Sequence, residues 1–173
     1  ERKRQFIGEF AAMNSSGAVV ICGGESMLDL EDYFAISTTC RTLGLKCLSV
    51  VNGTRIRDTK LADRMMLEGP DEVSVSLNSH HEALHDETRG VKGAFKKAVG
   101  ALRLLLEARK RHPERNNKIY AMGLIFDRNY RELDAFYDFV LNDIGADKLK
   151  LNFIQPSFGH GGVDPFFAEE IVQ

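Results

Sequence analysis

The chain has 173 residues, enough for one domain with a substantial core, and its formal net charge is −2. Apolar residues make up 43% of it and charged residues 28%, which is ordinary for a globular protein. Bulk attraction to nucleic acid is therefore not expected. No membrane partner is expected either, because no apolar run approaches the length of a membrane span. The chain opens on charged residues without a signal peptide, so we expect a cytoplasmic location.

Short apolar runs alternate with longer amphipathic segments along the chain. A helix is predicted first, over residues 3–12. The apolar runs then predict strands at 17–24, 45–54, 71–79, 117–126 and 147–156. The amphipathic segments predict helices at 28–44, 58–69, 93–112 and 130–145.

This alternation predicts an α/β fold of parallel strands covered by helices. Right-handed crossovers put the helices on one side of a sheet that curls into a barrel. Five strands do not close a barrel, and a helix that precedes the first strand implies a strand before it. We therefore expect a partial TIM-like barrel over residues 1–156, whose parent fold has its first strand and loop outside this chain. Residues 157–173 are expected to form a loop or tail.

The carboxyl ends of the strands form the active site in such folds. Nearly all the predicted strand ends carry small polar residues, which suits a ligand with many hydrogen-bonding groups. These strand ends are residues 23–26, 52–55, 76–79, 127–129 and 155–157.

Five segments resemble motifs of the radical S-adenosylmethionine (radical SAM) superfamily, in the family's order. "CGGES" at 22–26 resembles its GGE motif, "VVNGT" at 50–54 its TNG strand end, and "VSVSLNS" at 73–79 its SLD strand end. "HDETRGVKGAF" at 85–95 and "FDRNYRELDAFYDFV" at 126–140 resemble the segments that follow. The resemblance covers nearly the whole chain.

The resemblance implies a partial (βα)6 barrel, here with strands two to six, that holds S-adenosylmethionine and a 4Fe-4S cluster. Reductive cleavage of the cofactor would give a 5′-deoxyadenosyl radical that abstracts hydrogen from a small-molecule or peptide substrate. A reductant such as flavodoxin or ferredoxin is implied as a partner. The family's CxxxCxxC motif is absent, so we expect the cluster cysteines before residue 1, no metal ligand in this chain, and no activity of this piece alone.

The resemblance also implies cofactor contacts, each of which has a structural alternative. Gly23, Gly24 and Glu25 would receive the ammonium group of the cofactor, or simply make a tight turn. We expect Ser26, which replaces the family's usual proline, to cap the next helix. Thr54 would reach the cofactor's carboxylate, since the turn chemistry of the preceding Asn-Gly pair leaves it unexplained.

Further contacts are implied along the rest of the chain. Ser76 would contact the carboxylate or ribose, and Asn78, which replaces an aspartate, would face the substrate or only make a turn. Arg89 would pair with the carboxylate or lie on the surface. Asn129 would reach the ribose or cap the helix that follows.

Other titratable groups receive structural interpretations. The segment with His80, His81 and His85 resembles a loop and lacks carboxylates at zinc spacing, so we expect solvated histidines there. The scattered cysteines Cys22, Cys40 and Cys47 are expected to be buried and free.

Two other function classes stay open. A cluster-free relative could use the barrel mouth only for binding. An ordinary barrel lyase or aldolase needs a lysine or paired carboxylates at the strand ends, where only Glu25 and Asp127 are found.

Overall fold

A computed structural model describes residues 2–153 of the chain. Helix α1 comes first and is followed by strands and helices in turn. The bounds are α1 (Arg2–Met13), β1 (Ala18–Ile21), α2 (Leu30–Thr42), β2 (Lys46–Val51), α3 (Thr59–Leu67), β3 (Glu72–Ser76), α4 (Glu82–Arg89), α5 (Ala94–Arg111), β4 (Lys118–Ile125), α6 (Leu133–Asp138) and β5 (Lys148–Phe153). A 3-10 turn, Tyr130–Glu132, precedes α6, and a π-helical turn, Phe139–Ile144, follows it.

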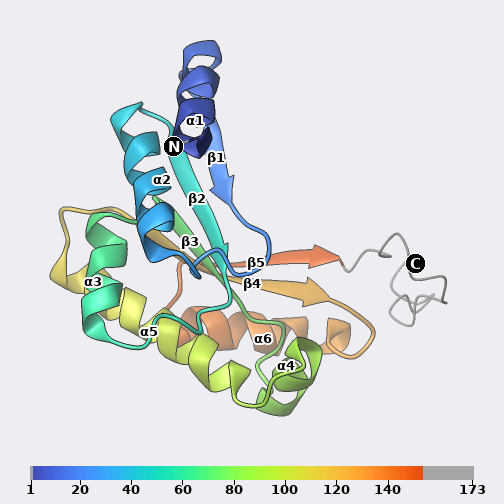
Figure 1. Cartoon of the computed structure of the whole chain (residues 1–173). Helices are drawn as coiled ribbons and strands as arrows, with labels where there is room; N and C mark the ends of the chain where they lie inside the picture. Colours follow the sequence, from blue (N-terminus) through green and yellow to red (C-terminus); the bar gives the residue numbers. More distant parts are fainter. Residues whose placement is uncertain (1, 154–173) are drawn as a thin grey trace, which may run out of the picture.

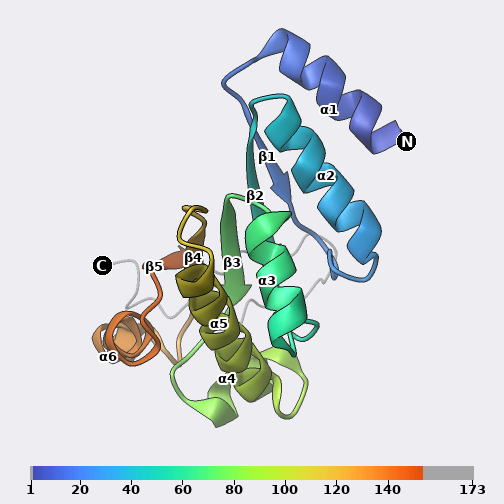
Figure 2. The same cartoon turned by 90° about the vertical axis from the view of Figure 1, so that its left-hand side faces the viewer.

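The strands form one open sheet in the order β1-β2-β3-β4-β5, and every neighbouring pair is parallel. Strand direction turns steadily from β1 to β5, and α2, α3, α5 and α6 gather on one side of the sheet (Figures 1 and 2). This arrangement confirms the predicted α/β class and the open, partial-barrel organisation of parallel strands.

The two faces of the sheet differ because successive side chains point to opposite sides. One face is packed under the helices, and its strand residues include the buried Val51, Val73, Val75, Ile119, Ala121 and Leu149. The opposite face, here called the inner face, carries the residues that alternate with these. Val20 on this face is 52% exposed, and Ser76 and Met122 are half-buried. The inner face is thus the surface that a ligand inside a barrel would contact.

The amino-terminal end of the inner face is crossed by a chain of ion pairs. Glu72 binds Lys46 through one carboxylate oxygen and Lys150 through the other, at 3.2 Å in the second case. The Lys150 ammonium also lies 4.2 Å from the centre of the Tyr120 ring. Burial raises the pKa of Glu72, but the two lysines outweigh it, so the net pKa lies below the usual range. This end of the inner face is therefore held together by charge.

The sequence-based boundaries need several corrections. Residues 82–89, expected to be part of a loop, form α4, and residues 130–145 form three consecutive turns of different pitch. Ser26 does not cap α2, because Asp29 is the N-cap and accepts the Asp32 N–H. Cys22 is exposed, whereas Cys40 and Cys47 are buried as expected. The expected strand end at 155–157 and the tail at 157–173 lie outside the described residues.

Candidate functional site

The turn after β1 leaves space above its main chain. Gly23 and Gly24 have φ values of 90° and 53°, a region that glycine occupies at low cost. A Cβ atom added to either residue would meet no atom of residues 2–153 within 4 Å. The positive φ values and the empty space together make this turn a place where a ligand can approach the backbone closely.

Glu25 follows these glycines, and its two carboxylate oxygens differ in their hydrogen bonding. Its Oε1 accepts the Met27 N–H at 3.1 Å. Its Oε2 is buried and has no hydrogen-bond partner within residues 2–153. Because a buried acceptor without a partner is costly, this oxygen calls for a donor from a bound molecule. An ammonium group fits that requirement well, because the resulting hydrogen bond is charge-assisted.

The turn after β2 is organised by Asn52, whose side-chain oxygen accepts the Thr54 N–H at 2.8 Å and the Thr54 hydroxyl at 2.7 Å. Gly53, with φ 78°, packs against α5: an added Cβ would lie 3.0 Å from both Ala101 and Val75. The Asn-Gly turn alternative therefore accounts for Asn52 and Gly53. The predicted contact of Thr54 with a carboxylate requires its hydroxyl to turn away from Asn52, and stays a prediction.

The ends of β3 and β4 are joined by a buried hydrogen-bond hub, formed by Asn78, His85 and Asn129. The Asn78 N–H donates to His85 Nδ1 at 3.0 Å. Asn129 Nδ2 donates to the carbonyls of Asn78 at 2.9 Å and Leu124 at 2.7 Å, and Asn129 Oδ1 accepts the Phe126 N–H at 2.9 Å. Asn129 stands at the N-cap position of the 3-10 turn, but its side chain makes no cap bond there.

The amide groups of Asn78 and Asn129 are therefore largely committed to the protein itself. The Asn78 Nδ2 group also donates to the Thr88 hydroxyl, at 3.1 Å. Both asparagines are buried, at 4% and 3% exposure. Their predicted contacts with a cofactor stay predictions, and the geometry shows that they fix the main chain of the strand ends. Ser76, by contrast, lies half-buried on the inner face at the last position of β3.

Two residues of the "HDETRG" segment, His85 and Asp86, make hydrogen bonds within the fold. His85 is buried, so the expectation of a solvated loop histidine is wrong for it; burial lowers its pKa to about 4. The Asp86 carboxylate accepts the Gly93 and Phe95 N–H groups at the start of α5, and these bonds lower the pKa of Asp86. Arg89 lies exposed in the last turn of α4, where its contact with a carboxylate stays a prediction.

A second carboxylate at the strand ends was not assigned to the site from sequence. Asp127 is the second residue after β4, and its Oδ1 is buried without a hydrogen-bond partner in the described part of the chain. Asp127 and Glu25 thus share the same unusual state at the same edge of the sheet. Only its position after a strand could have pointed to Asp127.

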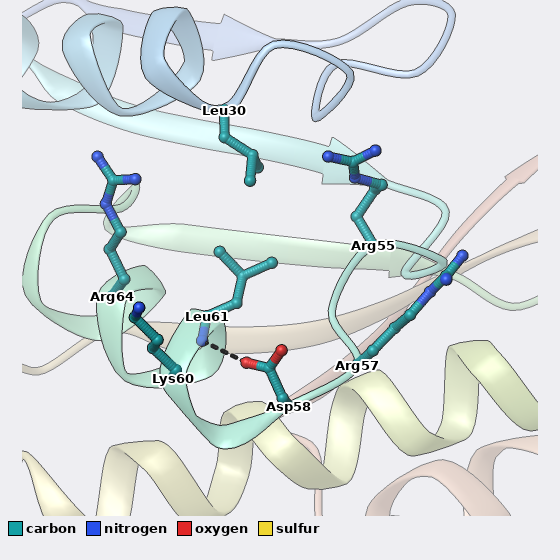
Figure 3. Close-up of a pocket in the computed structure, with 7 residues that line it drawn as sticks. All are labelled: Leu30, Arg55, Arg57, Asp58, Lys60, Leu61 and Arg64. Atoms are coloured by element: carbon teal, nitrogen blue, oxygen red, sulfur yellow. Dashed lines mark hydrogen bonds between the residues drawn. The ribbon is translucent and has the colours of Figure 1, made fainter.

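A basic groove lies outside the barrel, between the start of α2 and α3 (Figure 3). It encloses about 410 Å³, and Arg55, Arg57, Lys60 and Arg64 line it together with Leu30, Leu61 and Asp58. Asp58 caps α3 by accepting the Leu61 N–H at 2.8 Å. Arg64 is neutralised by Glu31 and Glu68, so the excess positive charge of the groove comes from Arg55, Arg57 and Lys60.

The model of the Radical SAM superfamily matches residues 4–140. This chain belongs to the radical SAM superfamily. In Methanosarcina barkeri (strain Fusaro), an "AdoMet-dependent heme synthase" is 27% identical over 157 residues, which cover 91% of this chain and 42% of that protein. The protein of the same name from Nitratidesulfovibrio vulgaris is 33% identical over 92 residues, 52% of this chain and 24% of that protein. The chain thus spans less than half the length of these relatives.

Radical SAM enzymes of known structure share the fold. The structure titled "Native anSMEcpe with bound AdoMet" has a TM-score of 0.72 at 15% identity and covers 95% of this chain and 45% of that one. SuiB of Streptococcus suis has a TM-score of 0.70 at 15% identity, covering 94% of this chain and 35% of that one. Membership of the superfamily identifies the chain as belonging to an enzyme. Within the described residues, no helix is long and apolar enough to cross a membrane.

Proposed function

We propose that the chain is the S-adenosylmethionine-binding body of a radical SAM enzyme. In this proposal the cofactor is cleaved reductively to methionine and a 5′-deoxyadenosyl radical, which abstracts hydrogen from the substrate. The observation that carries the proposal is the buried Oε2 of Glu25, which has no hydrogen-bond partner among residues 2–153, beside the turn at Gly23 and Gly24 that these residues leave open. An amino acid ammonium satisfies that oxygen, and the glycines let the ammonium approach the main chain.

The roles of the protein residues follow from their hydrogen-bonding capacity. Glu25 accepts from the ammonium group and so orients the methionine part of the cofactor. Ser76, on the inner face at the end of β3, offers a hydroxyl to the carboxylate or ribose. The His85–Asn78–Asn129 hub fixes the adjoining main chain, so these strand ends keep their shape when the cofactor arrives.

A 4Fe-4S cluster, when bound, supplies the electron for cleavage. The cysteines of this chain do not suit such a cluster, because Cys40 and Cys47 are buried under α1 and α2 in a small apolar cluster while Cys22 is exposed. We therefore assign no cluster ligand among them. The remaining steps that this chain can perform are binding and orientation of the cofactor.

The reductant that we propose is a small acidic electron carrier such as flavodoxin or ferredoxin. Charge complementarity favours the basic groove of Arg55, Arg57 and Lys60 as its docking surface. Charge reversal with Arg55→Glu and Arg57→Glu should lower the rate of 5′-deoxyadenosine formation when flavodoxin is the reductant. The rate with dithionite as the reductant should stay unchanged. Lys110→Glu, on the exposed surface of α5, is the matched control.

For the substrate we propose a tetrapyrrole of the heme type. The support is that the relatives from Methanosarcina and Nitratidesulfovibrio carry the name heme synthase. A peptide is the other class, because a superfamily structure of similar fold holds AdoMet together with a peptide. Tetrapyrrole products and peptide products can be separated by liquid chromatography with mass detection in one set of reactions.

The decisive experiment uses the full-length protein, prepared anaerobically with iron and sulfide and then reduced in the presence of S-adenosylmethionine. The expected result is 5′-deoxyadenosine, with less of it from the Glu25→Gln variant. Tight binding of S-adenosylmethionine by a protein that takes up no cluster would instead support the cluster-free binding module. Absence of cleavage with the cluster loaded would overturn the proposed cleavage. Absence of both binding and cleavage would overturn the proposal.

A further inference from the structure

Three metal-ligand atoms converge at the carboxyl edge of the sheet, away from Glu25. They belong to His80, His81 and Glu132, and all lie within 4.8 Å of one another. The histidines follow β3 directly before α4, and Glu132 ends the 3-10 turn that follows β4. His81 Nε2 lies 3.1 Å from a carboxylate oxygen of Glu132, and the two imidazole rings are 3.9 Å apart between centroids. Two segments thus supply one compact donor set, although 51 positions separate His81 from Glu132.

The donor set is selective in its chemistry. Two imidazole nitrogens and one carboxylate oxygen suit zinc and neighbouring divalent transition metals, whereas magnesium and calcium prefer oxygen ligands alone. Bonds of about 2.0–2.2 Å in a tetrahedral site hold the ligand atoms about 3.3–3.5 Å apart. The His81–Glu132 pair is already near that spacing at 3.1 Å.

Buried neighbours hold both segments in place. The Ser79 hydroxyl accepts the His81 N–H at 2.9 Å, and the Glu132 N–H donates to the Asn129 carbonyl at 3.0 Å. The His80 ring stacks on Phe136 with a centroid distance of 6.3 Å. A plain surface ion pair between His81 and Glu132 would not require His80 to lie against them.

We propose that His80, His81 and Glu132 bind one divalent ion of the zinc type. The ion would join the β3–α4 and β4–α6 segments at the edge of the sheet and leave a fourth position for water or another ligand. The site shares no residue with the proposed S-adenosylmethionine contacts, so it stands independently of the proposed function. It would add a second, separate metal to the iron of the cluster.

The test is a zinc titration of the full-length protein in competition with a chromophoric chelator. The protein is prepared anaerobically with its cluster loaded, and its iron content is measured before and after, which separates this site from the cluster cysteines. One equivalent of zinc is expected to bind, and His81→Ala and Glu132→Gln should each weaken its binding at least tenfold. His81 and Glu132 are exposed, so both variants should fold.

His112→Ala is the matched control, because His112 also lies beside two carboxylates, Asp63 at 3.2 Å and Glu114 at 3.5 Å, but belongs to no such three-residue group among residues 2–153. Its zinc affinity should equal that of the unchanged protein. Copper(II) loaded in place of zinc should show nitrogen hyperfine splitting that is reduced in His81→Ala. Zinc binding that is equally tight in all three variants, or no uptake by the unchanged protein, would overturn the proposal.

Discussion

The turn after β1 and the hub between β3 and β4 lie at the same edge of the sheet but treat their polar groups in opposite ways. At the turn, the part of the chain that the structure describes offers no partner to a buried oxygen of Glu25 and leaves the space above Gly23 and Gly24 open. At the hub, both ends of the Asn129 amide bond to main-chain groups, the Asn78 Nδ2 group donates to Thr88, and the Asn78 N–H donates to His85. Polar residues at the strand ends thus fall into two kinds: those with a group available to a ligand and those whose bonds stabilise the fold.

The hub should prove the more sensitive region to loss of a side chain. Asn129→Ala removes a partner from the Phe126 N–H and the Asn78 carbonyl, whose bonds are buried, and from the Leu124 carbonyl, whose bond is half-buried. Since each unsatisfied group costs about 1–3 kcal/mol, the free energy of unfolding should fall by about 3–5 kcal/mol. Urea titration of the purified protein measures the change. Asn116→Ala, in an exposed position, serves as the control and should leave stability unchanged.

Alanine substitutions at two glycines with positive φ test the contrast between the packed core and the open turn. Gly53→Ala introduces a Cβ 3.0 Å from Ala101 and Val75, and should lower the free energy of unfolding by about 2–3 kcal/mol. Gly23→Ala meets no atom and should cost only about 1 kcal/mol of backbone strain. Thermal unfolding compares the two variants. If Gly23→Ala were the more destabilising, the turn after β1 would belong to the packed core.

Glu25→Gln should separate binding from stability at the turn. The amide keeps an oxygen for the Met27 N–H but loses the charge that an ammonium group needs. We expect S-adenosylmethionine to bind about 10–100 times more weakly, in line with about 1.5–3 kcal/mol for a charge-assisted hydrogen bond. Equilibrium dialysis measures the affinity. Glu31→Gln, at an exposed position paired with Arg64, should bind the cofactor normally.

Acid should weaken the hub through His85. This histidine has a pKa of about 4 in the folded protein, so it stays neutral while the unfolded chain takes up a proton near the ordinary pKa of 6.5. The unfolded state then binds more protons, and stability falls as the pH drops from about 6.5 towards 4. Between pH 7.5 and 5 the loss should be about 1–2 kcal/mol. The His85→Leu variant should lack this decline, and a decline that persists there would assign it to other groups.

The order and type of most elements could be predicted from sequence because the apolar runs and amphipathic segments differ clearly in period. α4 could not, since its only buried residues are Leu84 and His85, and a polar segment of this kind carries no apolar stripe. The start of α2 was displaced because both Ser26 and Asp29 are suitable caps. Propensity does not choose between two such residues three positions apart.

The sequence could predict which residues share an edge of the sheet, because topology alone decides that placement. Parallel strands bring residues such as Gly24, Ser76 and Asn129 to one edge, whatever the details of packing. The state of a single oxygen, as in Glu25 or Asp127, depends on neighbours that arrive from other strands and cannot be inferred from a motif. The meeting of His81 with Glu132 is a long-range event of the same kind.

The ion pairs across the inner face affect the order in which ligands can enter and leave the barrel. The end opposite to Glu25 is occupied by the ion pairs of Glu72 with Lys46 and Lys150. Ligands would therefore enter at the carboxyl edge of the sheet. A cofactor and a substrate that both enter at this edge have to bind one after the other. The one bound deeper has to enter first and leave last, so cofactor and substrate would follow an ordered sequence set by the architecture rather than by their affinities.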